Sequence, residues 1–371
     1  MKTGDAARAT TKMAIYLFLD AAYERAMTQQ LLFGQTLWFD GNPLTSAWED
    51  CARFDSEGAV LIDGDTIVAV GPRATLRAQA PGAVVTDYGD GLIHAGFVDA
   101  HMHYPQTRII ASWGKQLIDW LNTYTFPEEA RFADRAYADT VAADTLDLAL
   151  AHGTTTLASY CTIHPASVDA FFMAARQRGM AVVAGKTCMD RNAMPALLDT
   201  AQSAYDDSKA LLENWHGVGR ASYAITPRFS PTSTPAQLEA MGALWSEFPD
   251  CLMQTHLSEQ HPEIAWVKEL FPNARDYLDT YEAFGLLGAR GLYGHAIHLE
   301  PREIDRLAEI GAATVHCPTS NTFIGSGLFD LLGLAKAGVV TGLATDTGGG
   351  SSFSMLRTMA AAYEVAQLRG V

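Results

Sequence analysis

The sequence predicts an α/β protein, a (β/α)8 barrel of the TIM type with a small β-domain built from its N-terminal segment. Two observations lead to this prediction. Eight apolar or β-branched runs alternate with helical segments after Leu92, which is typical of a parallel sheet, and eight is the number of strands that closes such a barrel. Histidine and carboxylate side chains also gather where these runs end, and that edge of a barrel carries its active site.

Composition narrows the class of protein. The chain has 371 residues, of which 48% are hydrophobic and 18% are charged, as in globular proteins. Its net charge of -16 argues against nucleic acid and against an anionic membrane surface as partners. No apolar run approaches the roughly 20 residues that span a bilayer. The five scattered cysteines are typical of a reducing compartment, so we expect a cytoplasmic protein.

Residues 1–26 are expected to be an unstructured or spurious extension. Basic residues precede a short apolar run at 13–19, as in a signal peptide, but Asp20 interrupts the run and no clean A-x-A site follows. Interpretable β pattern begins only after Met27. We therefore expect Met27 to be the natural start.

Residues 27–91 are expected to form the small β-domain, because short strands alternate there with turn residues. The stretch 58–71 predicts a hairpin whose strands are joined across Asp63-Gly64-Asp65. Glycine adopts the positive φ of such a turn without strain.

The barrel is expected over residues 92–371. Its strands are predicted at 92–101, 154–161, 181–188, 221–227, 252–257, 291–299, 313–316 and 339–345. Its helices are predicted at 133–151, 165–178, 195–214, 234–247, 261–284, 300–310 and 327–337. Glycines at 153, 179, 311 and 338 each end a helix before the next strand, as C′ glycines do. An open, doubly wound sheet is the alternative.

The first barrel strand ends in His101-Met102-His103. Alternate residues of a strand share a face, so the two imidazoles lie side by side while Met102 points to the other face. Such a pair suits a divalent metal, zinc above all. On this tripeptide alone, a chance pair of histidines explains the pattern as well as a metal site does.

The other strand ends change that balance, because six of the 11 histidines fall at them. The two histidines of strand one, His256 of strand five and Asp346 of strand eight would make a shell of three nitrogens and one oxygen, with room for a water. A purely structural metal is disfavoured because the set has no thiolate. Glu259 follows a ligand by three residues and is placed to move protons; the alternative is a surface carboxylate that opens a helix.

Strand four ends in Arg228-Phe229. The guanidinium offers planar, paired donors to ring acceptors, and the phenyl ring offers an aromatic face; a capping arginine and a core phenylalanine are the alternative. Cys317 is expected to be structural, and His298 and His316 to pack around the site. The three glycines from Gly348 are not followed by Lys-Ser/Thr, which rejects a Walker loop.

Five strings carry a family resemblance. GFVDAHMH, HLSE, GHAIHL, HCPTSN and GLATDTGGG occur in this order and resemble the amidohydrolase superfamily in its mononuclear, deaminase-type branch. The fuller strings HMHYPQ, CMDRN, TPRFS and ATDTGGG closely resemble those of the guanine deaminase family. The resemblance runs from about Met27 to the last residue. It implies a metal-dependent barrel that hydrolyses guanine to xanthine and ammonia, in purine catabolism or salvage.

The resemblance also implies roles for individual residues. The implied metal ligands are His101, His103, His256 and Asp346. The implied catalytic residues are Glu259 as proton shuttle, His295 as the residue that orients the attacking hydroxide, and Asp346. The implied contacts to the purine base come from Gln106, Arg228, Phe229, His103 and Glu259.

Binuclear members of the superfamily usually place a bridging lysine at the end of strand four. Arg228 stands there in this chain, and the nearest upstream lysine, Lys186, lies on strand three. We therefore expect one metal ion, zinc, with iron as the alternative. The expected partner is a small-molecule purine base, and the expected assembly is a homodimer.

Other interpretations remain open. Another aminohydrolase or chlorohydrolase of the same branch would act on a different purine, a pterin or a triazine. A metal-free binding module is disfavoured because all four ligands and Glu259 are present. The chain stops at Val371, inside the helix expected after strand eight. We expect the barrel to be incomplete after that strand, without its closing helix, and the C-terminal half of the β-domain to be missing.

Overall fold

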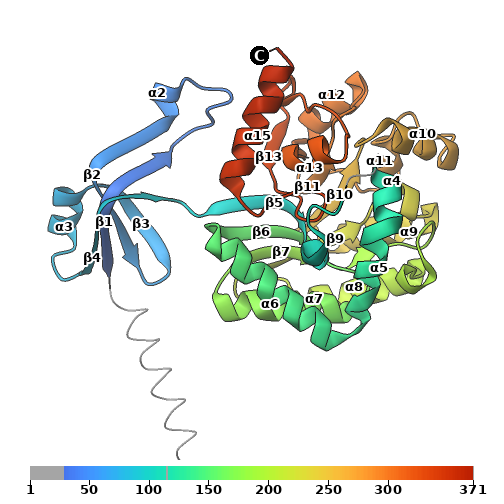
Figure 1. Cartoon of the computed structure of the whole chain (residues 1–371), viewed down its shortest axis with the longest axis horizontal. Coiled ribbons are helices and arrows are strands. Elements are labelled where there is room, and N and C mark those ends of the chain that lie inside the picture. Colours follow the sequence, from blue (N-terminus) through green and yellow to red (C-terminus); the bar gives the residue numbers. More distant parts are fainter. Residues whose placement is uncertain (1–28, 114–115, 371) are drawn as a thin grey trace, which may run out of the picture. The chain divides into compact units, whose positions relative to one another are not determined.

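The computed structural model describes residues 29–113 and 116–370, so the expectation for residues 1–26 lies outside the described residues. The chain divides into two compact units, with the boundary between Ala95 and Gly96. Each unit is described below by itself (Figure 1). No helix of the described segments is long and apolar enough to cross a membrane.

The first unit is a four-stranded sheet with the order β3-β2-β1-β4. Its elements are β1 (Gln30–Phe39), α2 (Trp48–Cys51), β2 (Ala52–Asp63), β3 (Thr66–Pro72), α3 (Arg73–Gln79) and β4 (Val84–His94). The predicted hairpin is confirmed: β2 and β3 pair antiparallel up to Asp63 and Thr66, and Gly64 between them has a φ of 62°. Leu31 and Leu61 pack against Leu76 of α3 in a small core.

The strand predicted at 92–101 is two strands. Leu92 and Ile93 belong to β4, where they pair in parallel with Gln35 and Thr36 of β1. The barrel strand starts only at Phe97. One apolar run thus serves two different sheets, and periodicity alone does not reveal where a run changes sheet.

The second unit is the predicted barrel. Its strands are all parallel, in the order β5-β6-β7-β9-β10-β11-β12-β13. They are β5 (Phe97–His103), β6 (Thr154–Tyr160), β7 (Ala181–Gly185), β9 (Ala221–Pro227), β10 (Leu252–Leu257), β11 (Gly291–His295), β12 (Ala313–His316) and β13 (Val340–Leu343), with the two-residue β8 (Thr187–Cys188) beside β9. The chain after β13 returns to β5, since the amide of Asp346 donates to the carbonyl of His101 over 2.9 Å.

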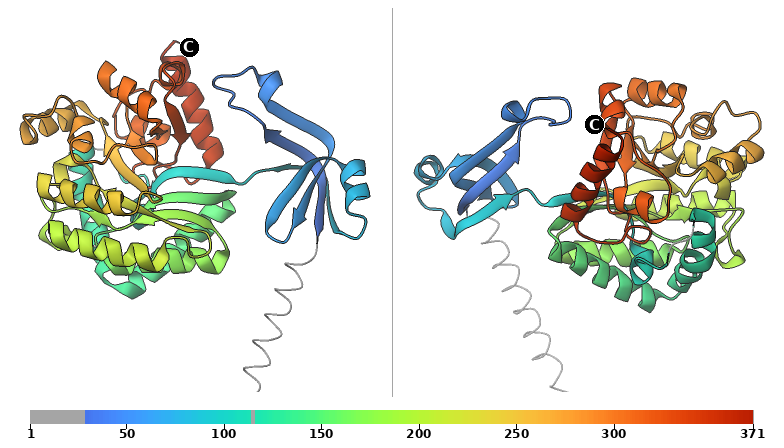
Figure 2. Two further views of the ribbon diagram at one scale, coloured as in Figure 1. Left: turned by 180° about the vertical axis from the view of Figure 1, so that it is seen from behind. Right: turned by 45° about the horizontal axis from the view of Figure 1, so that its top comes forward.

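Helices surround the strands of this unit on the outside (Figures 1 and 2). They are α6 (Arg135–Ala151), α7 (Pro165–Arg178), α8 (Ala201–Trp215), α9 (Pro235–Glu247), α10 (His261–Leu270), α11 (Asp279–Glu282), α12 (Pro301–Ile310), α13 (Pro318–Phe323), α14 (Leu331–Lys336) and α15 (Met355–Leu368). Gly179 and Gly311 end α7 and α12 with φ of 66° and 72°, which confirms their predicted role as C-caps.

Four helix predictions need correction. The helix predicted at 195–214 begins only at Ala201, after the 3-10 turn η4 (Pro195–Leu197). The helix predicted at 261–284 is α10 and α11, separated by a loop that contains Pro272, which lacks the amide a helix interior needs. The helix predicted at 327–337 starts at Leu331, after Asp330 caps it by accepting from the amide of Gly333 over 3.1 Å. The expected absence of a closing helix is wrong, because α15 follows the last strand.

The segment between β5 and α6 was not predicted to have regular structure. It forms the 3-10 turn η1 (Tyr104–Ile109), α4 (Leu117–Trp120), the π-helical turn η2 (Leu121–Thr125), α5 (Phe126–Glu129) and the 3-10 turn η3 (Ala130–Ala133). We call residues 104–133 the inserted segment. Its Leu117, Trp120 and Phe126 form an apolar cluster with Phe229 and Ile324, which lie beyond the C-terminal ends of β9 and β12.

Candidate active site

Four side chains from three strand ends converge on one point. His101 and His103 lie on β5, and both are buried, while Met102 between them packs into the core. The Nε2 atoms of His103 and His256 are 3.1 Å apart. Oδ1 of Asp346 lies 3.5 Å from Nε2 of His101 and 3.6 Å from Nε2 of His103. The structure therefore brings together all four side chains proposed as metal ligands.

These side chains have the protonation states that a metal requires. Burial lowers the pKa of His101, and it lowers the pKa of His103 and His256 well below the usual range. The rings are therefore neutral and can offer a lone pair. His256 keeps Nε2 free because its Nδ1 donates to the carbonyl of Arg228 over 2.7 Å.

The fourth proposed ligand is a carboxylate. Burial would raise the pKa of Asp346, but the imidazole of His101, 3.5 Å away, lowers it to about 2. The buried Nε2 of His101 has no hydrogen-bond partner among the described residues, and an unpaired buried nitrogen is costly unless a ligand covers it. The donor set, three imidazoles and a carboxylate, fits a divalent metal ion such as zinc.

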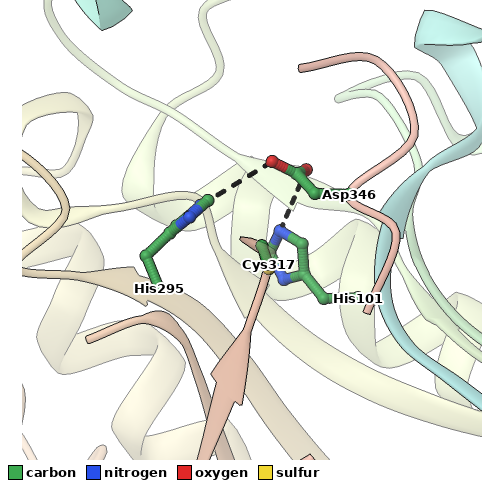
Figure 3. A group of neighbouring side chains, drawn as sticks. All are labelled: His101, His295, Cys317 and Asp346. Atoms are coloured by element: carbon green, nitrogen blue, oxygen red, sulfur yellow. Dashed lines mark ion pairs between the residues drawn. The ribbon is translucent and has the colours of Figure 1, made fainter. Parts of the chain in front are cut away.

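Figure 3 shows the carboxylate of Asp346 between His295 and His101, with Cys317 beside His101. Nε2 of His295 lies 4.0 Å from Oδ2 of Asp346. Cys317 is close enough to the same group to offer a sulfur ligand, but burial raises the pKa of its thiol well above the usual range. A protonated thiol is a poor ligand, so the expectation that Cys317 is structural stands as a prediction.

Glu259 lies between His295 and Ser326. Its Oε1 accepts a hydrogen bond of 2.8 Å from Oγ of Ser326, and its Oε2 lies 3.4 Å from Nε2 of His295. Burial raises the pKa of Glu259 to about 7. A carboxyl group with that pKa can both take up and release a proton near neutral pH.

His295 is held from its other side, because its Nδ1 lies 2.9 Å from Oδ1 of Asn321. Burial lowers the pKa of His295, but the charges of Glu259 and Asp346 outweigh burial and hold it above the usual value. A ring in this state can donate from Nε2 toward the point where the ligands meet.

Three of these positions have strained backbone. Ser258, His295 and Asp346 have φ of 47°, 66° and 48°, in the left-handed region that costs a non-glycine residue roughly 1–2 kcal/mol. Hydrogen bonds hold the bend at Ser258, whose carbonyl accepts from the amides of Ile297 and His298, each over 3.1 Å. Such strain is typical of functional sites.

Strand β5 also contributes a residue that sequence reasoning missed. Asp99 is buried and accepts from the amide of Thr345 over 3.0 Å. Burial raises the pKa of Asp99 to about 7. The contact fixes the residue that precedes Asp346, so Asp99 helps to place the carboxylate ligand. Its only signal was its place two residues before His101.

A cavity opens over three of the four proposed ligands, His103, His256 and Asp346. It is lined by His103, Gln106, Leu117, Trp120, Leu121, Arg228, Phe229, His256, Glu259, His295, Ser320, Ile324, Asp346 and Gly349. All the residues proposed to contact a base therefore line one cavity. Leu117, Trp120 and Leu121 of the inserted segment form a wall that was not predicted.

The polar side of this cavity depends on a carboxylate that was not predicted either. Both oxygens of Glu129 are bound by Arg228, from Nη1 to Oε2 over 2.7 Å and from Nη2 to Oε1 over 3.1 Å. Nε2 of Gln106 also donates to Oε1 of Glu129 over 2.9 Å. The only sign of this carboxylate in the sequence is the pair of acidic residues after Phe126-Pro127. The pair does not reveal that Arg228 and Gln106 bind one of them.

Two further histidines, His316 and His298, lie at the end of β12 and beyond the end of β11. The ring of His316 stacks on Phe329 with 4.4 Å between centroids, and burial lowers its pKa to about 3. His298 lies over His261 with 4.0 Å between centroids, and its Nε2 lies 2.8 Å from the carbonyl of Ser326. Neither ring lines the cavity.

Comparison with known proteins gives a consistent result. Residues 92–370 match the model of the amidohydrolase family, and residues 58–83 match an imidazolonepropionase-like composite domain of bacteria. The chain is 46% identical to guanine deaminase of Escherichia coli over 319 residues, which cover 86% of this chain and 73% of that protein. It is 44% identical to a probable guanine deaminase of Deinococcus radiodurans over 326 residues, which cover 86% and 74%.

The solved structure of the E. coli guanine deaminase superimposes with a TM-score of 0.90 at 43% identity, covering 92% of this chain and 80% of that one. Similarity therefore extends over both the sequence and the arrangement of the barrel.

Proposed function

The chain belongs to the amidohydrolase family, and from this premise we propose that it is a metal-dependent aminohydrolase that converts guanine and water to xanthine and ammonia. The proposal rests on one observation above all: the four proposed ligands, Glu259 and the donor pair of Arg228 line the same cavity, or border it directly. Chemistry and recognition of the base can therefore meet at one carbon atom.

His101, His103, His256 and Asp346 would hold a divalent metal ion, which would supply the Lewis acidity that makes water a nucleophile near neutral pH. Glu259 moves the protons. With a pKa of about 7, it takes one proton from the attacking water and passes it to a ring nitrogen. It then takes the second proton from the same oxygen, as the carbonyl forms, and gives it to the amino group, which leaves as ammonia. The Oγ of Ser326 holds Oε1 of Glu259, which leaves Oε2 on the side of His295. His295 donates from Nε2 and orients the attacking oxygen.

The base is held by the wall of the cavity that Arg228, Phe229 and Gln106 form. Arg228 donates to acceptor atoms of the purine ring, and Phe229, which is 3% exposed, offers its ring face. Gln106 adds an amide at the same wall. Leu117 and Trp120 exclude water from the cavity, which strengthens these hydrogen bonds.

We propose that the metal is a single zinc ion. Imidazole nitrogens and carboxylate oxygens are zinc ligands, and iron is the alternative that metal analysis tests. Removal of the ion with a chelator should abolish turnover, and one equivalent of zinc per chain should restore it. Restoration by iron but not by zinc would replace zinc in the proposal.

We further propose that the protein acts in the cytoplasm as a homodimer. All five cysteines are free and buried, which suits a reducing compartment. Helix α15 exposes Leu356, Met359 and Tyr363 on one side, an apolar surface that a second copy could cover. Light scattering after size-exclusion chromatography measures the mass directly, and a monomer at micromolar concentration would contradict the dimer.

Ammonia release is the test of the proposed reaction. The purified, zinc-loaded protein is assayed with guanine, adenine, cytosine, a pterin, 8-oxoguanine and an amino-substituted triazine. Guanine should give the highest kcat/KM. Faster turnover of a pterin or a triazine would assign the protein to another activity of the same family, and a metal-loaded protein inert toward all six would overturn the proposal.

A further inference from the structure

Glu129 organises the polar wall of the cavity. The carboxylate lies on α5, outside the barrel strands, and Glu129, Arg228 and Gln106 are 1%, 3% and 2% exposed. Arg228 donates to both of its oxygens and Gln106 donates to one of them. The carboxylate thus joins two ends of the inserted segment, at Gln106 and Glu129, to Arg228 beyond the end of β9.

This arrangement fixes the direction of every donor in the wall. Two parallel N–H bonds to a carboxylate set the plane of a guanidinium as well as its position, and three of the five N–H groups of Arg228 remain for other acceptors. The amide of Gln106 is fixed in the same way, because its nitrogen faces Glu129. Its oxygen lies beside Gly348, where an added Cβ would come within 2.1 Å.

We propose that Glu129 is a positioning residue that sets the selectivity for the base, by holding Arg228 so that this wall accepts a ring carbonyl and rejects an amino group in its place. This inference rests on the proposed function. A guanidinium can only donate hydrogen bonds. A carbonyl oxygen of the base accepts from the N–H groups of Arg228. An amino group in its place is itself a donor, so the N–H groups of both remain without an acceptor, and a buried unpaired donor costs about 1–3 kcal/mol.

The chain offers a matched control in the preceding residue. Glu128 lies on the same short helix and is 7% exposed. Its carboxylate accepts from Nη1 of Arg131 over 2.9 Å and from the hydroxyl of Tyr137. Neither Glu128 nor these two partners line the cavity. Glu128→Gln therefore removes a buried carboxylate from the same helix without touching Arg228.

The experiment measures binding and not turnover. Calorimetry gives the Kd of hypoxanthine, which carries a carbonyl at ring position 6, and of adenine, which carries an amino group there. The zinc-loaded wild type should bind hypoxanthine more tightly. Glu129→Gln should reduce that preference about tenfold, since a neutral amide no longer holds both guanidinium nitrogens, while Glu128→Gln should keep the wild-type ratio.

Retention of the wild-type ratio by Glu129→Gln overturns the inference, as does an equal loss in Glu128→Gln. Glu129→Asp covers the case in which Glu129→Gln does not fold. The shorter carboxylate keeps the charge but draws Arg228 back, so a reduced preference at normal metal content supports positioning, and an unchanged preference overturns it. Failure of the proposed function is distinguishable, because wild-type protein without guanine turnover would refute the reaction while the binding ratios still test Glu129.

Discussion

The two sides of the cavity arise from different kinds of structure. The side with the proposed metal ligands is made by strand ends, where His101 and His256 are placed by the hydrogen-bonded ladders of the barrel sheet. The opposite side is made by the inserted segment, whose Leu117, Trp120 and Glu129 lie on helical pieces of four residues each. Strand pairing sets the register of each strand, and with it the position of each side chain. A helix of four residues is not stable by itself, so its position depends on side-chain contacts.

This difference suggests a division of labour, in which the strand ends hold the groups for catalysis and the inserted segment helps to hold the base. Atoms that take part in bond making need positions held within about 0.5 Å, and the sheet supplies them. The side that surrounds the base rests on packing and on the Arg228–Glu129 pair, and can change without changing the chemistry. The variants below test this division, beginning with the largest effect.

Asp346→Asn should produce the largest loss. It replaces the only carboxylate among the proposed ligands by a neutral amide, and the three imidazoles that remain should bind a divalent ion less well. Metal content and ammonia release should fall together, measured by elemental analysis beside turnover. A variant with full metal content and full activity would remove Asp346 from the ligand set.

Glu259→Gln separates proton transfer from metal binding. The amide keeps the size of the carboxyl group but cannot carry protons, so we expect a loss of roughly 10²–10⁴-fold in kcat with metal content near that of the wild type. If the metal is lost as well, Glu259 is a ligand. If turnover is normal, the shuttle lies elsewhere and His295 is the next candidate.

Arg228→Ala tests the opposite side. The metal should remain bound, while kcat/KM for guanine falls by about 1–3 kcal/mol, or roughly 5- to 150-fold, because acceptors of the base are left unpaired. The variant should also lose about 3–5 kcal/mol of stability, since Glu129 becomes an unpaired buried charge. The double variant Arg228→Met with Glu129→Leu should recover the stability but not the activity. Recovery of both would show that the pair is only structural.

The pKa of Glu259 predicts the pH profile. Because the carboxylate must accept the first proton and its pKa is about 7, kcat/KM should rise about tenfold per pH unit below that value and level off above it. Glu259→Gln should lack this rising limb. A limb of equal slope in the variant would assign the titration to another group.

The smallest effect on activity is expected at Glu303 of α12, outside both sides of the cavity. It is 1% exposed, and burial raises its pKa to about 7 from 4.5. A carboxyl group whose pKa is higher in the folded state contributes stability below its unfolded pKa and loses it as pH rises. The free energy of unfolding should therefore fall by about 3 kcal/mol between pH 4.5 and pH 7 through this group. Glu303→Gln should lack this contribution to the pH dependence. Urea unfolding at pH 4.5 and pH 7 measures it, with unchanged turnover at pH 7 as the control.

The sequence was sufficient to predict the barrel and the convergence of the strand-end residues. Local sequence pattern shows the strands and places His101 and Asp346 at strand ends. A parallel barrel sheet brings those ends together at one edge. Glu129 could not be found in this way, because its partners Gln106 and Arg228 lie 23 and 99 residues away and no periodicity links them. The helix predicted at 261–284 failed for a related reason, since an apolar spacing can persist through a loop.

The left-handed backbone at Ser258, His295 and Asp346 constrains how such a protein could adapt to heat. At His295 and Asp346 the side chains are needed, so selection for thermal stability cannot relieve the strain by glycine without losing the function we propose. Ser258 has no role in the proposed chemistry, and glycine there would relax the bend by up to about 1–2 kcal/mol. It would also loosen the turn between His256 and Glu259. Laboratory evolution for heat resistance alone should therefore reach Ser258→Gly at the expense of turnover, and selection for both traits should find its stabilising changes away from the strand ends.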